Sequence, residues 1–208
     1  MIILDFLEKF RCFPAFSLRQ VELAYPGFER ENLLNWQKKG YIVRIRNGWY
    51  TVKGRISTEA HLYWVANKIY APSYVSLESA FSHYGWIPEA VFTVTSVTTR
   101  KTQAFDTPVG YFRYSSTKPL LHFGYRLLDV DGYGAKMAEP EKALLDFLYF
   151  HPRVVDQDAF EALRLNVEQV RNDLNRETLE AYCALFESDA LEKRLCTFTK
   201  YLYHAETI

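Results

Sequence analysis

The sequence of 208 residues predicts an α+β fold with two units, residues 1–55 and 56–208. Apolar residues recur with helical spacing at the N-terminus, between Glu59 and Tyr84, and again after Ala138. From Val91 to Leu128 they alternate with a period of two, which is typical of strands. A polar stretch with a glycine, residues 53–56, has the composition of a linker between the two units.

The chain begins with a short amphipathic segment. Its pattern predicts a helix over Ile2–Phe10, with Ile3, Phe6, Leu7 and Phe10 on the buried side. Charged residues interrupt the apolar run, so the segment does not read as a signal peptide. We expect it to close the core of the first unit.

Residues 17–40 predict two helices joined by a turn. Ser17 is a favourable N-cap for a helix over Leu18–Ala24, because its hydroxyl can accept from a free amide of the first turn. Pro26-Gly27 interrupts that helix. A second helix is predicted over Glu29–Lys39, and Gly40 follows it in the favoured C-cap position.

The second of these helices has two different faces. Leu33 and Trp36 define one side, with Leu34 and Gln37 at its edge, and this side is expected to pack on the preceding helix. The opposite side carries hydrogen-bonding residues, as contact with the major groove of DNA requires. These residues are Glu31, Asn35 and Lys38, with Asn32 and Lys39 beside them.

A basic hairpin follows. Asn47-Gly48 between two runs rich in β-branched and aromatic residues is a strong hairpin signal, because both residues can adopt positive φ. Arg44 and Arg46 are two residues apart and are therefore predicted to share one face of the first strand. Helix, turn, helix and basic hairpin together predict a winged helix-turn-helix domain that binds DNA. The alternative is a small helical unit with a solvated hairpin.

The predicted DNA contacts have different roles. Arg44, Arg46 and Lys38 are expected to hold phosphates, whereas Asn32 and Asn35 are expected to reach base edges. Because one such domain gives limited affinity, two copies on an inverted repeat, or two sites bound cooperatively, are expected. The full predicted set is Arg19, Gln20, Arg30, Asn32, Asn35, Lys38, Lys39, Arg44, Arg46 and Asn47.

The charge is distributed unevenly although the net charge is zero. Residues 1–56 carry ten Lys/Arg against five Asp/Glu, and residues 152–208 carry seven against eleven, so the two ends suit different partners. The three cysteines form no CxxC motif, which fits a reducing cytoplasm better than a disulfide framework. The sequence contains no apolar run near the ~18 residues that a membrane span needs.

The second unit is predicted to combine helices and strands. Pro140 in the first turn favours a helix that ends near His151, and Asp131–Gly134 is predicted to be a loop. The other predicted helices are Glu59–Ile69, Ser76–Tyr84, Asp158–Arg164, Val167–Leu174 and Thr178–Leu202 with a break near Ser188, and the predicted strands are Phe92–Val97, Gly110–Tyr114 and Phe123–Leu128.

The sequence contains one pattern that is typical of a metal site. Asp129-Val-Asp131 has the spacing of a magnesium-binding DxD, but the Gly-Ser turn that nucleotidyltransferases also need is missing, so a polar turn is the preferred interpretation. The five histidines lack ligand spacing. We expect no enzymatic activity, no cofactor and no metal.

Two further features have open roles. The basic loop Thr98–Thr102 could contact phosphate or the acidic surface of a partner, although an ordinary loop is the preferred interpretation. Lys142 and Asp146 are four residues apart on a predicted helix and are expected to pair on its surface.

Five segments of the chain together resemble a known family. They are Pro72–Phe81, Tyr84-Gly85 with Pro88, Thr95–Arg100, Thr107–Gly110 and Ala138–Asp146. In this order they are similar to the AbiEi family, the antitoxins and transcriptional regulators of type IV toxin–antitoxin systems linked to abortive infection. The resemblance extends over about residues 15–150.

The resemblance implies two activities. Such a protein binds operator DNA in its own promoter and represses the operon, and it opposes a GTP-binding nucleotidyltransferase toxin without requiring a stable complex. The sequence is also compatible with two other classes of protein: a stand-alone regulator whose C-terminal domain binds a ligand or a protein, and an enzyme or an enzyme's accessory subunit.

Overall fold

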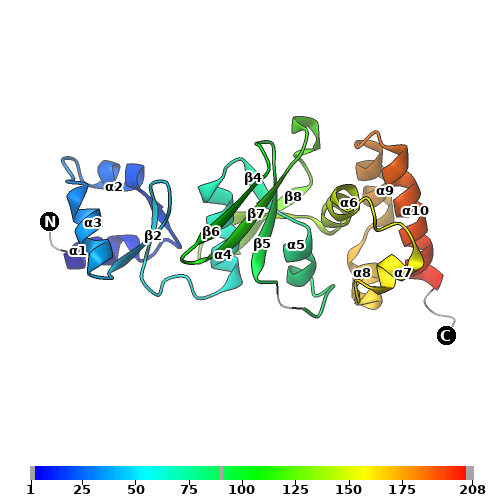
Figure 1. The fold of residues 1–208 in the computed structure, drawn as a ribbon, viewed down its shortest axis with the longest axis horizontal. Helices are drawn as coiled ribbons and strands as arrows, with labels where there is room; N and C mark the ends of the chain where they lie inside the picture. The colour runs from blue at the N-terminus through cyan, green and yellow to red at the C-terminus, as the bar shows by residue number, and fades with distance from the viewer. Residues whose placement is uncertain (1–2, 90, 205–208) are drawn as a thin grey trace.

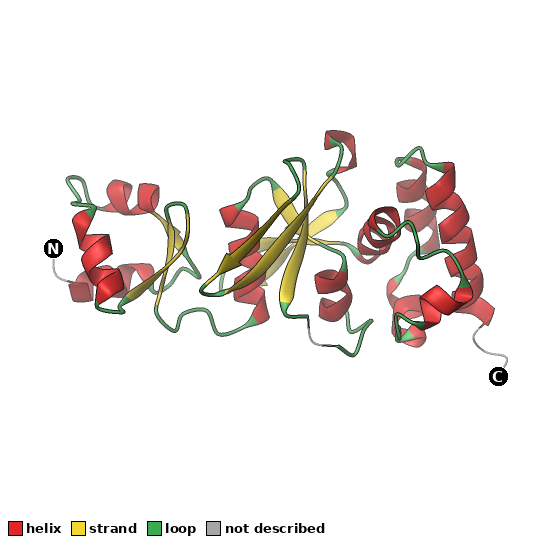
Figure 2. Cartoon of the chain, viewed as in Figure 1, coloured by secondary structure: helices red, strands yellow, loops and turns green. Residues whose placement is uncertain are grey.

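The computed structural model describes residues 3–89 and 91–204 and has a mixed α+β fold, as the sequence predicts. The chain is elongated (Figure 1): an N-terminal unit lies at one end, a six-stranded sheet lies in the middle, and a group of helices lies at the other end. Figure 2 shows that strands are confined to the first two parts. The predicted boundary after residue 55 falls between strand β3 and helix α4.

The N-terminal unit contains three helices and a small sheet. The helices are α1 (Ile3–Phe10), α2 (Leu18–Ala24) and α3 (Glu31–Lys38), and the strands are β1 (Phe16–Ser17), β2 (Ile42–Arg46) and β3 (Trp49–Val52). The strands are antiparallel in the order β1-β3-β2. A separate hydrophobic cluster of nine buried residues holds these elements together: Phe6, Phe10, Phe16, Val21, Leu33, Trp36, Ile42, Tyr50 and Val52.

Local signals explain the ends of these helices. The Ser17 hydroxyl accepts a hydrogen bond from the Gln20 amide at 3.2 Å, and the Gln20 side chain accepts one from the Ser17 amide at 2.7 Å. This reciprocal capping box confirms the predicted start of α2. Gly40 follows α3 with a φ of +73°, as a C-cap glycine does. The predicted first helix is also confirmed, except that Ile2 lies outside the described residues.

The central part is a six-stranded mixed sheet with the strand order β6-β7-β5-β4-β9-β8. The pairs β4–β9 and β5–β7 are parallel, and the other neighbours are antiparallel. Helix α4 covers one face, where the Tyr114 hydroxyl donates to the Ala66 carbonyl at 2.8 Å. The elements are α4 (Glu59–Ile69), β4 (Ser73–Val75), α5 (Glu78–His83), β5 (Thr93–Thr98), β6 (Gln103–Thr107), β7 (Gly110–Ser116), the 3-10 helix η1 (Pro119–Leu121), β8 (Tyr125–Val130) and β9 (Tyr133–Ala138).

Three of these strands were not predicted. Strand β4 has only three residues, too few to show a period of two. Strand β6 is an edge strand whose residues are mostly exposed, so it lacks an apolar face. The prediction of a loop over Asp131–Gly134 was wrong for its second half, because β9 starts at Tyr133. Its Gly-Ala-Lys run has low β-propensity and is stabilised by its neighbours β4 and β8.

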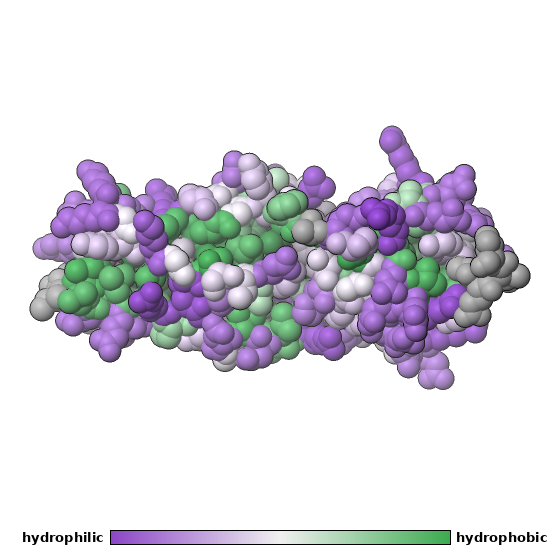
Figure 3. Space-filling model, turned by 90° about the horizontal axis from the view of Figure 1, so that it is seen from below, coloured by the Kyte–Doolittle hydropathy of each residue, from purple (hydrophilic) through white to green (hydrophobic). Residues whose placement is uncertain are grey.

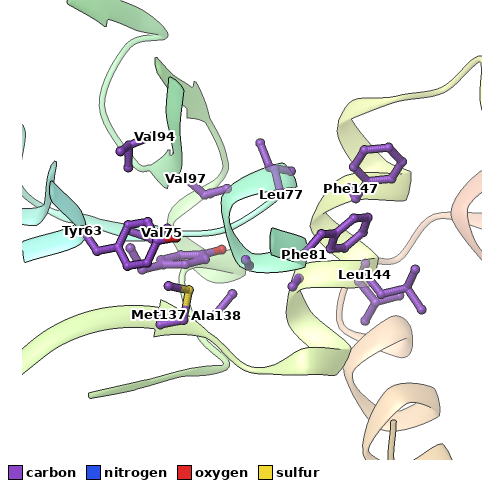
Figure 4. Close-up of a cluster of buried hydrophobic side chains, with 14 of the residues drawn as sticks. Tyr63, Val75, Leu77, Phe81, Val94, Val97, Met137, Ala138, Leu144 and Phe147 are labelled. Atoms are coloured by element: carbon purple, nitrogen blue, oxygen red, sulfur yellow. The ribbon is translucent and has the colours of Figure 1, made fainter. Parts of the chain in front are cut away.

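The C-terminal part consists of helices, which are α6 (Pro140–Phe150), α7 (Gln157–Glu161), α8 (Val167–Asp173), α9 (Arg176–Ala184) and α10 (Asp189–His204). The predicted break near Ser188 is confirmed, since the Ser188 hydroxyl accepts from the Leu191 amide at 3.3 Å and begins a new helix. Figure 4 shows Phe81 of α5 pointing toward Phe147 of α6, with ring centroids 4.9 Å apart, so α6 joins the sheet region to the helices.

The surface differs along the chain. In the view of Figure 3, hydrophilic side chains cover most of the C-terminal helices, whereas larger apolar areas lie over the N-terminal unit and the central part. No helix among the described residues combines the length and the apolar character needed to cross a membrane.

Candidate nucleic-acid interface

The hairpin of strands β2 and β3 has the predicted turn. Asn47 and Gly48 both have positive φ, 33° and 80°, which the twist of a tight hairpin requires. The Gly48 carbonyl accepts from the Leu18 amide at 2.7 Å. The hairpin turn is therefore attached to the first residue of α2, which fixes the hairpin against the helices.

A bulge separates the two arginines of the hairpin. Arg44 is opposite Tyr50 and Arg46 is opposite Trp49, so two steps along β2 correspond to one step along β3, with Ile45 as the additional residue. Directly opposed residues in an antiparallel pair share a face, and neighbouring residues of β3 point to opposite faces. The prediction that Arg44 and Arg46 share one face was therefore wrong, because the inserted residue reverses the alternation.

The two arginines consequently have different environments. Arg44 is exposed on the face that also carries the buried Tyr50. Arg46 faces the central part of the molecule, where its guanidinium carbon lies 3.4 Å from the centroid of the Phe105 ring and 6.0 Å from that of Tyr70. Such stacking keeps the charge of a guanidinium while shielding one of its faces.

Helix α3 has the two predicted faces. Leu33 and Trp36 are buried, and the Trp36 ring packs against Phe6 of α1 with centroids 4.5 Å apart. The predicted polar face, with Asn35 and Lys38, is exposed. Leu34 was expected at the edge of the packed side but is 57% exposed. The solvent-facing surface of α3 thus includes one large apolar side chain.

The other predicted contact residues of α3 and the hairpin differ in exposure. Asn32 is partly buried, and Lys39 is exposed at the C-cap of α3. Asn47 is exposed at the hairpin turn. The described helix and hairpin therefore present amides and cations, which are the groups that contact base edges and phosphates, together with the exposed carboxylate of Glu31.

Two of the three predicted contact residues on and near α2 form hydrogen bonds within the protein. Arg19 is exposed. The side-chain oxygen of Gln20 accepts from both the amide and the hydroxyl of Ser17, at 2.7 and 3.0 Å, so this residue has a capping role. Arg30 donates to Glu22 from two nitrogens, at 2.9 and 2.7 Å. Its charge is locally compensated, although the pair is exposed.

A cation that was not assigned to the interface, Arg100, shares an aromatic ring with an arginine of the hairpin. The side chain of Arg100, in the loop between β5 and β6, has its guanidinium carbon 4.4 Å from the centroid of the Tyr70 ring, which Arg46 also approaches. The next residue, Lys101, is exposed. The sequence marked this loop as basic and hydroxyl-rich, but no sequence signal placed it near residue 46.

A second set of contacts connects the N-terminal and central parts. Arg55 donates to the Arg11 carbonyl at 2.7 Å and to the Asp131 carboxylate at 2.5 Å, and Nε2 of His61 lies 2.9 Å from the same carboxylate oxygen. Hydrogen bonds from His61 and Arg55 lower the pKa of Asp131 below its ordinary value of 3.8.

The two carboxylates of the Asp-Val-Asp motif therefore have separate structural roles. Asp131 takes part in that contact, whereas Asp129 accepts from the Gly132 amide at 3.1 Å within the turn between β8 and β9. In residues 3–89 and 91–204, no group of three or more His, Cys, Asp and Glu side chains is arranged to hold a metal ion.

No protein-family model matches the chain, and no curated protein sequence matches it.

Proposed function

We propose that this chain is a DNA-binding transcriptional autorepressor with an N-terminal winged helix-turn-helix domain. The observation that carries the proposal is the arrangement of α3 and the β2–β3 hairpin: α3 buries Leu33 and Trp36 while it exposes Asn35 and Lys38, and a hairpin with an exposed Arg44 follows directly. In this proposal α3 enters the major groove and Arg44 contacts a backbone phosphate.

The second part of the proposal is antitoxin activity against a nucleotidyltransferase toxin, and it rests on the resemblance to the AbiEi family. Three of the similar segments meet at one buried polar cluster. Ser76 and Tyr74 donate to Asp146 at 2.8 and 2.9 Å, and Thr95 donates to the Ser76 carbonyl at 2.7 Å. Because these side chains are mutually dependent, a shared pattern of them supports a shared fold of the C-terminal domain.

Binding to the DNA upstream of the chain's own gene tests the repressor function. In a salt series, the full chain should bind this DNA more tightly than a scrambled duplex, and affinity should fall as salt rises because phosphate contacts release counterions. Asn35→Ala should reduce discrimination between the two duplexes by about 1–3 kcal/mol. Lys38→Ala should weaken binding to both duplexes alike.

A control variant and a toxin-rescue assay complete the test of the two proposed activities. Lys193→Ala, an exposed lysine of α10, should leave both affinities unchanged. Equal binding to operator and scrambled DNA by the wild type would refute sequence-specific repression. For the antitoxin function, expression of the chain should restore growth of cells that produce the nucleotidyltransferase encoded beside it, and failure to do so would refute this function alone.

A ligand-regulated repressor is the second candidate, and a cavity favours it. A space of about 350 Å³ lies between α9 and α10, with Leu179, Leu195 and Tyr203 in its wall. This volume is near the lower end of the range for small-molecule sites, about 300–1,000 Å³. A small molecule that raises the melting temperature and releases DNA would support this candidate. Leu195→Trp, which fills the cavity, should abolish both effects.

A further inference from the structure

Hydrogen bonds hold the loop between strands β5 and β6 in a defined conformation. The Thr98 hydroxyl donates to the Pro72 carbonyl at 2.6 Å and accepts from the Arg100 amide at 3.2 Å. The Tyr70 hydroxyl donates to the Lys101 carbonyl at 2.9 Å, and the Ser116 amide donates to the Thr102 hydroxyl at 3.1 Å. The backbone that carries Arg100 and Lys101 is therefore held in one shape.

This loop lies next to the hairpin through a shared aromatic contact. Arg100 approaches the Tyr70 ring at 4.4 Å, and Arg46 approaches the same ring at 6.0 Å and the Phe105 ring at 3.4 Å. Figure 1 shows the hairpin at the side of the N-terminal unit that faces the central sheet, and β6 is the edge strand of that sheet. Arg46 and Arg100, which come from the two parts of the chain, thus approach the same aromatic ring, and the exposed Lys101 follows Arg100 in the loop; these three residues are called the cation group.

This group lacks compensating carboxylates. Within the part of the chain that the structure describes, none of the three side chains forms an ion pair with Asp or Glu, whereas Arg30 pairs with Glu22 at 2.7 Å. Arg46 and Arg100 carry like charges beside one ring, and a polyanion bound there relieves their repulsion. Nη1 of Arg100 donates to the Ala71 carbonyl at 3.4 Å, and aromatic stacking leaves the other N–H groups of both guanidinium groups able to donate to phosphate oxygens.

We propose that the β5–β6 loop, through Arg100 and Lys101, is a second phosphate contact of the DNA-binding surface. It extends the footprint from the hairpin to the backbone of flanking base pairs, with Arg46 between the two contacts. This inference rests on the proposed function. It assigns part of the DNA surface to the second unit, so the two units bind DNA as one body.

The test compares Arg100→Ala/Lys101→Ala with Lys193→Ala/Lys200→Ala, a matched pair of exposed cations on α10. Affinity of the full chain for its upstream DNA is measured by fluorescence anisotropy at several salt concentrations. The loop variant should bind roughly tenfold more weakly at moderate salt, and the slope of log K against log salt should become shallower by about two. The α10 variant should match the wild type.

One further variant and a shortened duplex keep the test independent of folding defects. Arg100→Lys/Lys101→Arg retains both charges and should restore the wild-type salt slope. On a duplex shortened at the flank next to the hairpin, wild type and loop variant should bind equally, because the phosphates reached by the loop are gone. A loop variant that remains weaker on the short duplex would overturn the proposal.

The outcomes separate the inference from the function on which it rests. If Arg44→Ala flattens the salt slope and the loop variant does not, the loop proposal fails and the repressor function stands. If the loop variant binds DNA normally but no longer rescues cells from the toxin, the loop serves an acidic protein partner and the DNA proposal is wrong. If the wild type does not bind DNA, the proposed function itself fails.

Discussion

Lys142 and Asp146 form an ion pair on α6 that is closed to solvent, with side-chain exposures of 0% and 1%. The carboxylate also accepts from Tyr74 and Ser76, and the ammonium group lies 4.9 Å from the centroid of the Phe186 ring. Burial lowers the pKa of Lys142, and the neighbouring carboxylate opposes that shift. The expectation of a surface pair was correct in its partners and wrong in its location.

This burial makes Lys142→Met a sensitive probe of the fold. The substitution leaves the charge of Asp146 without its cation in the protein interior, so we expect the free energy of unfolding to fall by about 3–5 kcal/mol in urea titrations. Lys193→Met on exposed α10 serves as the control and should change it by less than about 0.5 kcal/mol. A loss below 1 kcal/mol for Lys142→Met would contradict a buried pair.

The double variant Lys142→Met/Asp146→Leu tests the coupling of the two charges. Because it removes both charges together, it should destabilise the protein by clearly less than the sum of the two single substitutions. Some loss should remain, since the hydroxyls of Tyr74 and Ser76 then lack their acceptor. Simple additivity would show that the pair does not interact.

The contact of Asp131 with Arg55 and His61 predicts a pH dependence of stability. These partners lower the pKa of Asp131 in the folded chain, whereas the unfolded chain keeps the ordinary value of 3.8. The contact therefore stabilises the fold fully above pH 3.8 and loses this effect as the pH falls through the lower folded-state pKa. Asp131→Asn should lower the melting temperature at pH 7, and its difference from the wild type should shrink toward pH 3.

An exposed carboxylate provides the control for that pH series. Asp106→Asn on edge strand β6 should leave the melting temperature close to that of the wild type at both pH values. If Asp131→Asn differs from the wild type by the same amount at pH 7 and pH 3, the carboxylate charge is not what joins these residues.

The capping box of α2 predicts a smaller, local effect. Ser17→Ala removes the side-chain acceptor for the Gln20 amide and should lower the free energy of unfolding by about 1 kcal/mol. Ser17→Asn supplies another good capping side chain and should retain nearly all of it. Equal losses for both variants in urea unfolding would indicate a packing role for Ser17 instead of a capping role.

The extent of successful prediction follows from how local each signal is. Ser17, Gly40 and Asn47-Gly48 act on residues within one turn of themselves, and the elements they delimit were predicted correctly. The bulge at Ile45 has no local signature, because apolar and basic residues alternate through it without interruption. The burial of Lys142 could not be predicted either, because an i, i+4 pair has the same sequence spacing on a surface as in a core.

The candidate site was likewise predictable from the sequence only where the signal is local. The exposed face of α3 could be predicted from helical periodicity, which reports which side of a helix is apolar. The neighbours of Arg46 could not be predicted, because Phe105 lies in an edge strand whose sequence lacks the apolar alternation that is typical of strands. Contacts between distant segments depend on how the whole sheet is assembled, and a single sequence contains no local pattern that predicts the order of its strands.

The contact between Arg46 and Phe105 predicts a measurable coupling between the hairpin and the central sheet. In a double-mutant cycle of Arg46→Ala and Phe105→Ala, urea unfolding should give an interaction energy of about 0.5–2 kcal/mol, the range of cation–π contacts. The cycle of Arg44→Ala with Phe105→Ala should give a value near zero, because the bulge directs Arg44 to the other face. If the two cycles give equal energies, the hairpin does not rest on β6 through Arg46, and the loop with Arg100 would no longer be positioned to extend its surface.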